Sequence, residues 1–247
     1  MGGTDRRTRI GRVGVTIAID GPAGSGKSTV SRRIATELGI GYLDTGAMYR
    51  ALTWYALDRG IDLADQAAVV AAAGRMPLTM DSDPQDPHYF VGDTEVTGAI
   101  REPRITESVA AVSTNLGVRR WMAGEQRRRM LEARDRGSGM VAEGRDITTV
   151  VCPDADVRIL LVADSEARLA RRALELYGDT APEHLEATRR QVQGRDAADS
   201  TVSEFLTPAP GVSVVDSSGL SVEQVVDAVL ALVDDDLARR GALVDER

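Results

Sequence analysis

Residues 18–29 read AIDGPAGSGKST, and this stretch decides the fold. Its core, GPAGSGKS over residues 21–28, fits the pattern G-x-x-x-x-G-K-[ST] at every fixed position. The β-branched run at 15–19 before it predicts a buried strand, and the apolar stripe after it predicts a helix over 28–38. In that setting the glycines let backbone amides turn inward, and the helix N-terminus adds positive charge. The stretch therefore predicts a loop that binds phosphate groups.

Lys27 is the only lysine of the chain, although lysine and arginine together number 30. A compact ammonium fits inside a tight loop where the wide, planar guanidinium of arginine does not. We expect Lys27 to reach the β- and γ-phosphates of ATP and the Ser28 hydroxyl to bind Mg²⁺. The rest of the ATP-binding loop comprises Gly21, Pro22, Ala23, Gly24, Ser25, Gly26 and Thr29. The alternative is a glycine-rich turn without a ligand.

The composition is that of an ordinary globular protein, 43% apolar and 28% charged, with a net charge of −8. This acidic balance gives no basic footprint for nucleic acid, and no apolar run is long enough for a membrane span. Residues 1–12 lack the apolar stretch of a signal peptide, and the single Cys152 argues for a reducing compartment. We therefore expect a cytoplasmic monomer that acts on a small molecule, with neither nucleic acid nor membrane as a partner.

Short strands alternate with helical segments along the chain, and we expect them over 15–19, 41–43, 140–142, 157–162 and 212–215. This alternation predicts an α/β fold in which helices cover both faces of a parallel sheet. The turn-rich segment 78–99, between the second and third strands, predicts a small β insertion. Ser221 and Gln224 predict a capping box for a final helix, whose apolar face would hold Val222, Val225, Val226, Val229 and Val233.

Charged and polar side chains follow the second and third expected strands, at the edge where the phosphate-binding loop also lies. Thr45 can cap the next helix, and Arg50 lies just over one turn further on, where its guanidinium can fork a second phosphate group. Glu143 can hold Mg²⁺ through water, while Arg145 and Asp146 can meet a phosphate and the polar edge of a base. A solvated, charged surface is the alternative for each of them.

A cationic group follows the fourth strand, where Arg168, Arg171 and Arg172 recur at helical spacing on one face. Behind a phosphate-binding loop, such a cluster can form a lid that neutralises a transferring phosphoryl group. A solvated helix surface is the alternative. Arg195 and Asp199 follow, one helical turn apart.

Together these pieces resemble the bacterial cytidylate kinases, a family of nucleoside monophosphate kinases, over residues 15–233. The resemblance is most specific in DGPAGSGKST, LDTGAMYRAL, the β insertion before GAIR, and EGRDITTVVCPDA. The strings RRQVQGRDAADST and VVDSSGLSVEQV also match. It implies a three-layer P-loop NTPase fold with a five-stranded parallel sheet, and ATP-dependent phosphorylation of CMP or dCMP with Mg²⁺. It also implies a single domain over 14–234, with an acceptor-binding lobe at 45–135 and a lid at 168–182. We expect residues 1–13 to be disordered and 235–247 to form a solvated tail at the end of the last helix.

The resemblance implies roles for single residues as well. Substrate binding would involve Asp44, Thr45, Arg50, Arg119, Arg145, Asp146, Arg195 and Asp199. Within this set, Thr45, Arg50 and Arg145 would hold the CMP phosphate. Arg119 and Asp146 would read the cytosine, because an arginine and an acid can pair with the polar edge of that base.

The same resemblance places the ribose against Arg195 and Asp199. Mg²⁺ would be held by Ser28 and Glu143. The catalytic residues would be Lys27, Arg145, Arg171 and Arg172.

Several positions depart from the family pattern, and they cluster on the acceptor side. Ala110 stands where the family commonly has a serine that helps read the base, and Val202 where it has an arginine near the acceptor phosphate. Thr148 replaces a usual glycine, and residues 115–117 replace a proline-containing turn. Two alternatives therefore stay open: a kinase of the same architecture with a different acceptor in a specialised pathway, and a nucleotide-binding module without catalysis.

Overall fold

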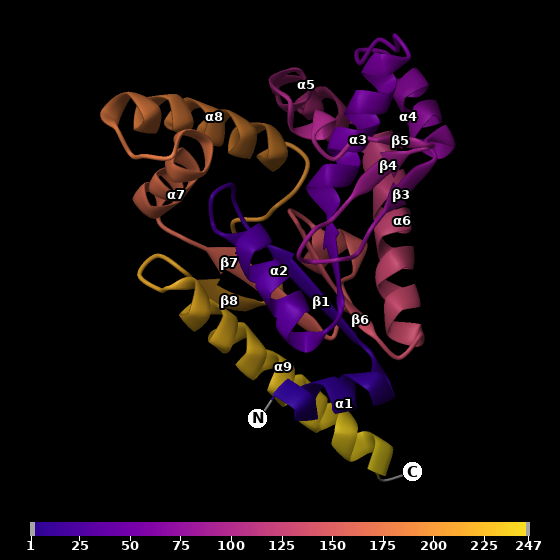
Figure 1. Ribbon diagram of the computed structural model, residues 1–247, viewed down its shortest axis with the longest axis vertical. Helices are drawn as coiled ribbons and strands as arrows, with labels where there is room; N and C mark the ends of the chain where they lie inside the picture. The colour runs from indigo at the N-terminus through magenta and orange to yellow at the C-terminus, as the bar shows by residue number, and fades with distance from the viewer. Residues whose placement is uncertain (1–2, 246–247) are drawn as a thin grey trace.

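A five-stranded parallel sheet runs through the centre of the computed structural model, which describes residues 3–245 (Figure 1). The strands lie side by side in the order β2-β6-β1-β7-β8. Their bounds are β1 Val15–Asp20, β2 Gly41–Asp44, β6 Gly139–Gly144, β7 Val157–Val162 and β8 Ser213–Asp216. The predicted α/β fold is thus confirmed, and so are the five strands to within a few residues.

The central strand β1 shows why this segment forms a buried strand. Ile17 and Ile19 pack on one side of the sheet, while Ala18, between them, packs on the other, and all three are fully buried. A strand that is buried on both faces favours continuous β-branched residues over an alternating apolar and polar pattern. The run VTIAID satisfies this requirement.

Helices cover both faces of the sheet. The first helix layer consists of α1 Gly3–Val13, α2 Lys27–Leu38 and α9 Val222–Asp245. The opposite layer consists of α3 Thr45–Asp58, α4 Gln66–Arg75, α5 Pro103–Ser113, α6 Leu116–Asp135 and the short π-helix η2 Ile147–Val151. The 3-10 turn η1 Ala99–Arg101 directly precedes α5. No helix within the described residues 3–245 is both long and apolar enough to cross a membrane.

The predicted β insertion is a three-stranded antiparallel sheet, made by β3 Leu78–Met80, β4 Tyr89–Val91 and β5 Thr94–Glu95. On the other side of the molecule, α7 Ser165–Tyr177 and α8 Pro182–Ser200 pack against each other. Figure 1 shows this pair across from the lobe that carries α3, α4 and α5, with α8 reaching toward α5. The two groups of helices rise on either side of one edge of the sheet.

The prediction of a disordered lead over 1–13 is wrong for residues 3–13, which form α1; residues 1–2 lie outside the described part. Ile10 is 2% exposed and joins the core of α2 and α9. Arg6 forms a two-pronged ion pair with Asp234, both contacts at 2.8 Å, and Arg7 donates to two carbonyls at the end of α2. The polar composition of this segment therefore predicted disorder wrongly. One buried isoleucine and two arginines with specific partners are enough to hold α1 against the rest of the fold.

The segment 235–247, expected to be a solvated helix end, is helical up to Asp245 but not solvated throughout; residues 246–247 are outside the described part. Leu237 is 1% exposed, and Arg240 pairs with Asp236 and with Asp156. At the other end of α9, the capping box of Ser221 and Gln224 is confirmed by reciprocal hydrogen bonds. Val222 was expected on the buried face but is 39% exposed, since it lies in the first turn, before α9 meets the sheet.

Candidate active site

The carboxyl ends of β1, β2 and β6 meet at one edge of the sheet. The strand register pairs Asp20 with Gly144 and Asp44 with Glu143. The loop over 21–26 leaves this same edge and leads into α2. The phosphate-binding loop and the charged segments after β2 and β6, which the sequence predicted separately, therefore lie together at the place where parallel sheets bind ligands.

The loop has the backbone of an anion cradle. Gly24 has φ of 76° and Gly26 has φ of 91°, a left-handed region that glycine adopts without strain. Gly26 caps α2 without a side-chain hydrogen bond, and the first turn of α2 carries no acidic residue. The first amides of α2 are therefore available to bind a phosphate, and the positive end of the helix dipole faces it.

Lys27 is the charged group inside this loop. Its Nζ donates to the Pro22 carbonyl over 2.8 Å, so the side chain folds back along the loop. Removal of the ammonium from water, together with the nearby Arg145 guanidinium, lowers the pKa of Lys27 to about 7. A bound phosphate reverses that effect, because negative charge next to the ammonium favours its protonated form.

Glu143, at the end of β6, is buried beside the loop at 4% exposure. Burial and the neighbouring Asp44 raise the pKa of Glu143, and Lys27 opposes them. The Tyr42 hydroxyl donates to Glu143 Oε1 over 2.5 Å, and the nearby Ser28 side chain acts to lower the pKa of this carboxyl. A hydroxyl and a carboxylate side by side at a phosphate loop fit Mg²⁺, which takes one or two protein oxygens and completes its shell with phosphate and water.

Asp20 connects the phosphate loop to the segment that carries Arg145 and Asp146. Its carboxylate accepts from the Ile147 amide at 2.9 Å and from both the amide and the hydroxyl of Thr148 at 2.7 Å. Asp20 and Thr148 are 2% and 3% exposed. Thr148, a departure from the family pattern, thus supplies an additional donor to a buried acid. Sequence reasoning assigned no role to either residue.

The segment after β2 is organised by Asp44 rather than by Thr45. Asp44 caps α3 by accepting from the Ala47 amide at 2.8 Å, whereas Thr45 was expected to be the cap. Thr45 donates to the Glu143 carbonyl at 2.6 Å and so joins β2 to β6. Arg50 pairs with Asp44 at 2.8 Å, and among the described residues its buried Nε has no hydrogen-bond partner. A guanidinium N–H without a partner suits a phosphate oxygen.

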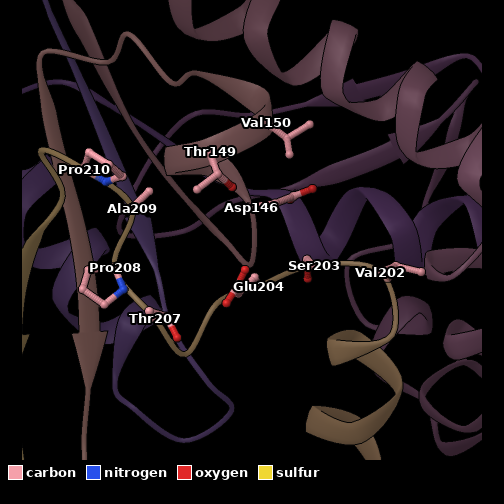
Figure 2. A pocket seen from close by; sticks show the side chains of 10 residues that line it. All are labelled: Asp146, Thr149, Val150, Val202, Ser203, Glu204, Thr207, Pro208, Ala209 and Pro210. Atoms are coloured by element: carbon pink, nitrogen blue, oxygen red, sulfur yellow. The ribbon is translucent and has the colours of Figure 1, made fainter.

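Arg119 and Asp146 form the pair that the resemblance assigns to base recognition. Arg119 donates to Asp146 Oδ2 over 2.5 Å and to the Ser113 carbonyl over 3.1 Å. Burial raises the pKa of Asp146, against the effect of Arg119. The acid also lines a pocket of about 450 Å³, and Figure 2 shows Asp146, Thr149 and Val150 along one side of it and the loop 202–210 along the other.

Arg145 lies at the centre of the site. Its Nε donates to Asp199 over 2.8 Å, its Nη2 lies 3.3 Å from Asp196, and its Nη1 donates to the Gly21 carbonyl of the phosphate loop. The guanidinium carbon lies 4.7 Å from the centre of the Phe205 ring. Arg145 therefore joins the phosphate loop, α8 and the loop that follows α8.

The three arginines of α7 that the sequence predicted as a lid cluster do not form one charged surface. Arg168 donates to the Ala23 carbonyl at 3.1 Å and to Asp196 at 2.5 Å. Arg171 donates to the hydroxyl and carbonyl of Ser217, at 2.9 and 2.5 Å. Arg172 pairs with Glu175 on its own helix. Each of them thus engages a separate partner.

Arg195 lies further from Asp199, its expected partner, than Arg145 does. Its side chain is 44% exposed, and its Nε lies 3.9 Å from Asp199 Oδ2. Asp199 instead makes its shorter contact with Arg145. Arg195 is therefore the cation of the expected acceptor set with the most freedom to reach a ligand.

Two residues that the sequence did not single out complete the site. Asp196 accepts from the Ala23 amide of the phosphate loop at 3.1 Å, and it also binds Arg145 and Arg168. Phe205 packs beneath Arg145 at 2% exposure. The signal for Asp196 was its place between Arg195 and Asp199, whereas for Phe205 only its rarity, as one of two phenylalanines, was visible.

A phosphate loop between the central strand of a parallel sheet and a helix, facing a second site rich in arginine, defines a P-loop kinase of the nucleoside monophosphate class. A family model described as cytidylate kinase matches residues 17–235. The chain belongs to the cytidylate kinase family.

Two cytidylate kinases of similar sequence agree with this assignment. A cytidylate kinase of Streptomyces avermitilis is 42% identical over 227 residues, which cover 92% of this chain and 95% of that protein. A cytidylate kinase of Cutibacterium acnes is 45% identical over 220 residues, 89% and 96% of the two chains. Among solved structures, a shikimate kinase from Acinetobacter baumannii has a TM-score of 0.42 at 16% identity, over 90% of this chain and 94% of that one.

Proposed function

We propose that this protein transfers the γ-phosphoryl group of ATP to CMP or dCMP, forming CDP or dCDP and ADP. Membership of the cytidylate kinase family supports this function. The structural observation that supports it is that the loop with Lys27 and the Arg50–Asp44 ion pair follow neighbouring strands at one edge of the sheet. A donor and an acceptor held side by side are what a direct transfer between two nucleotides requires.

The donor site consists of the loop over 21–29. Backbone amides from Gly24 to Ser28 would hold the β- and γ-phosphates, and Lys27 would move from the Pro22 carbonyl onto their oxygens. Ser28 and Glu143 would hold Mg²⁺, with Tyr42 fixing the orientation of the Glu143 carboxylate. When bound, the metal neutralises charge that develops on the transferring group.

The acceptor site consists of the arginines that face this loop. Arg50 and Arg145 would grip the phosphate of CMP, while Asp44 orients Arg50 through its ion pair and Thr45 fixes β2 to β6. Arg119 and Asp146 would pair with the cytosine. Ala110 offers no hydroxyl for the base, so base recognition falls more heavily on this pair.

The remaining charged residues would bind the ribose and form the lid. Asp199 and Arg195 would contact the sugar, and Arg171 and Arg172 would close over the transferring phosphoryl group. We assign the acceptor-binding lobe to residues 45–135 and the lid to 168–182. Closure excludes water, which would otherwise compete with CMP for the γ-phosphoryl group.

The reaction needs no strong general base. An ionised oxygen of the CMP phosphate attacks the γ-phosphorus, a new P–O bond forms, and the bond to the β-phosphate oxygen of ADP breaks. Because the nucleophile is already an anion, the site contributes mainly position and positive charge. Arg145 donates to Asp196, Asp199 and the Gly21 carbonyl, so only its remaining N–H groups would bind the phosphate.

The test is ADP release from Mg-ATP with CMP, dCMP, UMP and AMP as acceptors. We expect CMP and dCMP to give the highest kcat/KM. A K27M variant controls for a contaminating kinase, since it should fold and yet lose turnover. Faster turnover of UMP or AMP than of CMP and dCMP would contradict the proposed acceptor, and ATP binding without turnover of any acceptor would contradict the proposed reaction.

A further inference from the structure

Phe205 lies in the loop between α8 and β8, and it is one of only two phenylalanines in the sequence. Its ring is 2% exposed, although the residues around it in this loop include the 59% exposed Leu206. The covered ring faces the guanidinium of Arg145, with 4.7 Å from the guanidinium carbon to the ring centre. A buried aromatic side chain in an otherwise open loop is thus placed against a charged group of the site.

Arg145 makes two kinds of contact, hydrogen bonds from its N–H groups and a contact with the Phe205 ring. Asp199, Asp196 and the Gly21 carbonyl accept hydrogen bonds in the plane of the guanidinium, from its three nitrogens. A guanidinium has five N–H groups, so two stay available in that plane. The guanidinium carbon also lies over the face of the Phe205 ring, a contact that uses none of the N–H groups. The ring therefore restricts movement of Arg145 without using any donor.

We propose that Phe205 is a positioning residue for Arg145, which it holds by a cation–π contact so that the free N–H groups point at the acceptor phosphate. The inference rests on the proposed function, because it assumes that Arg145 binds that phosphate. An aromatic face attracts a cation that lies over it, more strongly when both are shielded from water. Arg145 is 13% exposed, so the contact is largely shielded.

The sequence just before Phe205 shows why a fixed position of Arg145 matters in this chain. Val202, three residues before Phe205, stands where the family resemblance predicts an arginine near the acceptor phosphate. Val202 lines the pocket beside Asp146 and offers no charge there. The phosphate must therefore be held by Arg50 and Arg145, and any freedom of Arg145 weakens that grip directly.

The first experiment replaces Phe205 by 4-fluoro- and by 3,4,5-trifluorophenylalanine in the full-length protein. Fluorine withdraws charge from the ring face and weakens a cation–π contact, yet it hardly changes the packing of the ring. We expect kcat/KM for CMP to fall stepwise, by about 5- to 30-fold for the trifluoro ring, because such contacts reach about 1–2 kcal/mol when shielded. KM for ATP and the melting temperature should change little.

The matched control is Phe90, the other phenylalanine, which lies in β4 of the insertion. The same fluorinated rings at Phe90 should leave kcat/KM for CMP unchanged. A flat response at Phe205 would overturn the proposal, and so would an equal loss for CMP and ATP accompanied by a lower melting temperature. If the unmodified protein fails to phosphorylate CMP, the proposed function fails instead, and the positioning role is decided by a second measurement.

That measurement is a double-mutant cycle in urea, which needs no activity. Phe205→Leu keeps an apolar side chain of similar volume, and Arg145→Gln removes the cation. If the ring acts through Arg145, the two losses of stability are not additive, because each variant already removes the same contact. Additive losses would show that Phe205 only fills space beneath the loop.

Discussion

Thr148→Val removes one hydroxyl from beneath the site while keeping the volume of the side chain. This hydroxyl donates to Asp20 Oδ2 over 2.7 Å, and both residues are buried, at 3% and 2% exposure. A hydrogen bond to a charged group contributes about 1.5–3 kcal/mol to stability. We therefore expect the variant to lose about 2 kcal/mol of unfolding free energy at a pH where Asp20 is ionised.

The size of this loss should depend on pH. Burial raises the pKa of Asp20 to about 6, against the hydrogen bonds from Thr148 and Ile147. The folded-state pKa thus lies above the unfolded value of 3.8, so the folded protein binds the proton more tightly, and this group's contribution to stability falls as pH rises between the two values. Below that interval the carboxyl is protonated and the lost bond is neutral, worth about 1 kcal/mol. The loss in Thr148→Val should therefore shrink by about half on acidification.

The assay is urea unfolding followed by circular dichroism, well above and well below the pKa of Asp20. The matched control is Thr53→Val, because Thr53 is equally buried but donates to a neutral carbonyl, that of Tyr49 in α3. Its loss should be the same at both pH values. A loss in Thr148→Val that does not change with pH, or no loss at all, would refute the idea that Thr148 supports an ionised Asp20.

Three further predictions address other parts of the structure. Because the pKa of Lys27 is lowered to about 7, binding of Mg-ATP should take up close to one proton at about pH 8 and almost none at about pH 6. Calorimetry in buffers of different ionisation enthalpy measures this proton uptake, and equal uptake at both pH values would contradict the lowered pKa. Tyr42→Phe should raise the Mg²⁺ concentration needed for half-maximal Mg-ATP binding by about tenfold, because the Glu143 carboxylate loses a donor at 2.5 Å. An unchanged Mg²⁺ requirement in titrations of nucleotide fluorescence would contradict a positioning role for Tyr42. Ile10→Ala should lower the unfolding free energy by about 2–4 kcal/mol, because Ile10 is 2% exposed in the core between α1, α2 and α9. A loss below about 0.5 kcal/mol in urea unfolding would show that α1 does not pack against α2 and α9.

The donor half of the site could be predicted from sequence because its chemistry is local. A strand, a glycine-rich turn and a helix follow each other within residues 15–38, so the position of Lys27 depends on contacts between near neighbours. The sheet was predictable for the same reason, since β-branched runs such as 15–19 reveal strands that are buried on both faces.

The acceptor half depends on contacts that the sequence does not display. Asp196 and Phe205 acquire their roles only when α8 and the loop after it fold over Arg145, which is more than 50 positions away in the chain. The capping role of Asp44 was missed for a smaller reason. Both Asp44 and Thr45 are good caps, and only the backbone geometry decides between them.

The errors at the two ends of the chain share a physical cause. Residues 3–13 and the end of α9 are rich in charged groups, which usually indicate a solvated segment. Here those charges have partners on other elements, Arg6 with Asp234 and Arg240 with Asp156. A charge pattern identifies an exposed segment only when no partner of opposite sign is placed to meet it.

The most direct test of the proposed function is phosphorus NMR of the purified protein with Mg-ATP and CMP. We expect the γ-phosphate signal of ATP to decline while the β-phosphate signals of ADP and CDP grow in equal amounts, with no inorganic phosphate. Equal growth shows direct transfer between the two nucleotides. Inorganic phosphate in place of CDP, or an unchanged spectrum, would contradict the account.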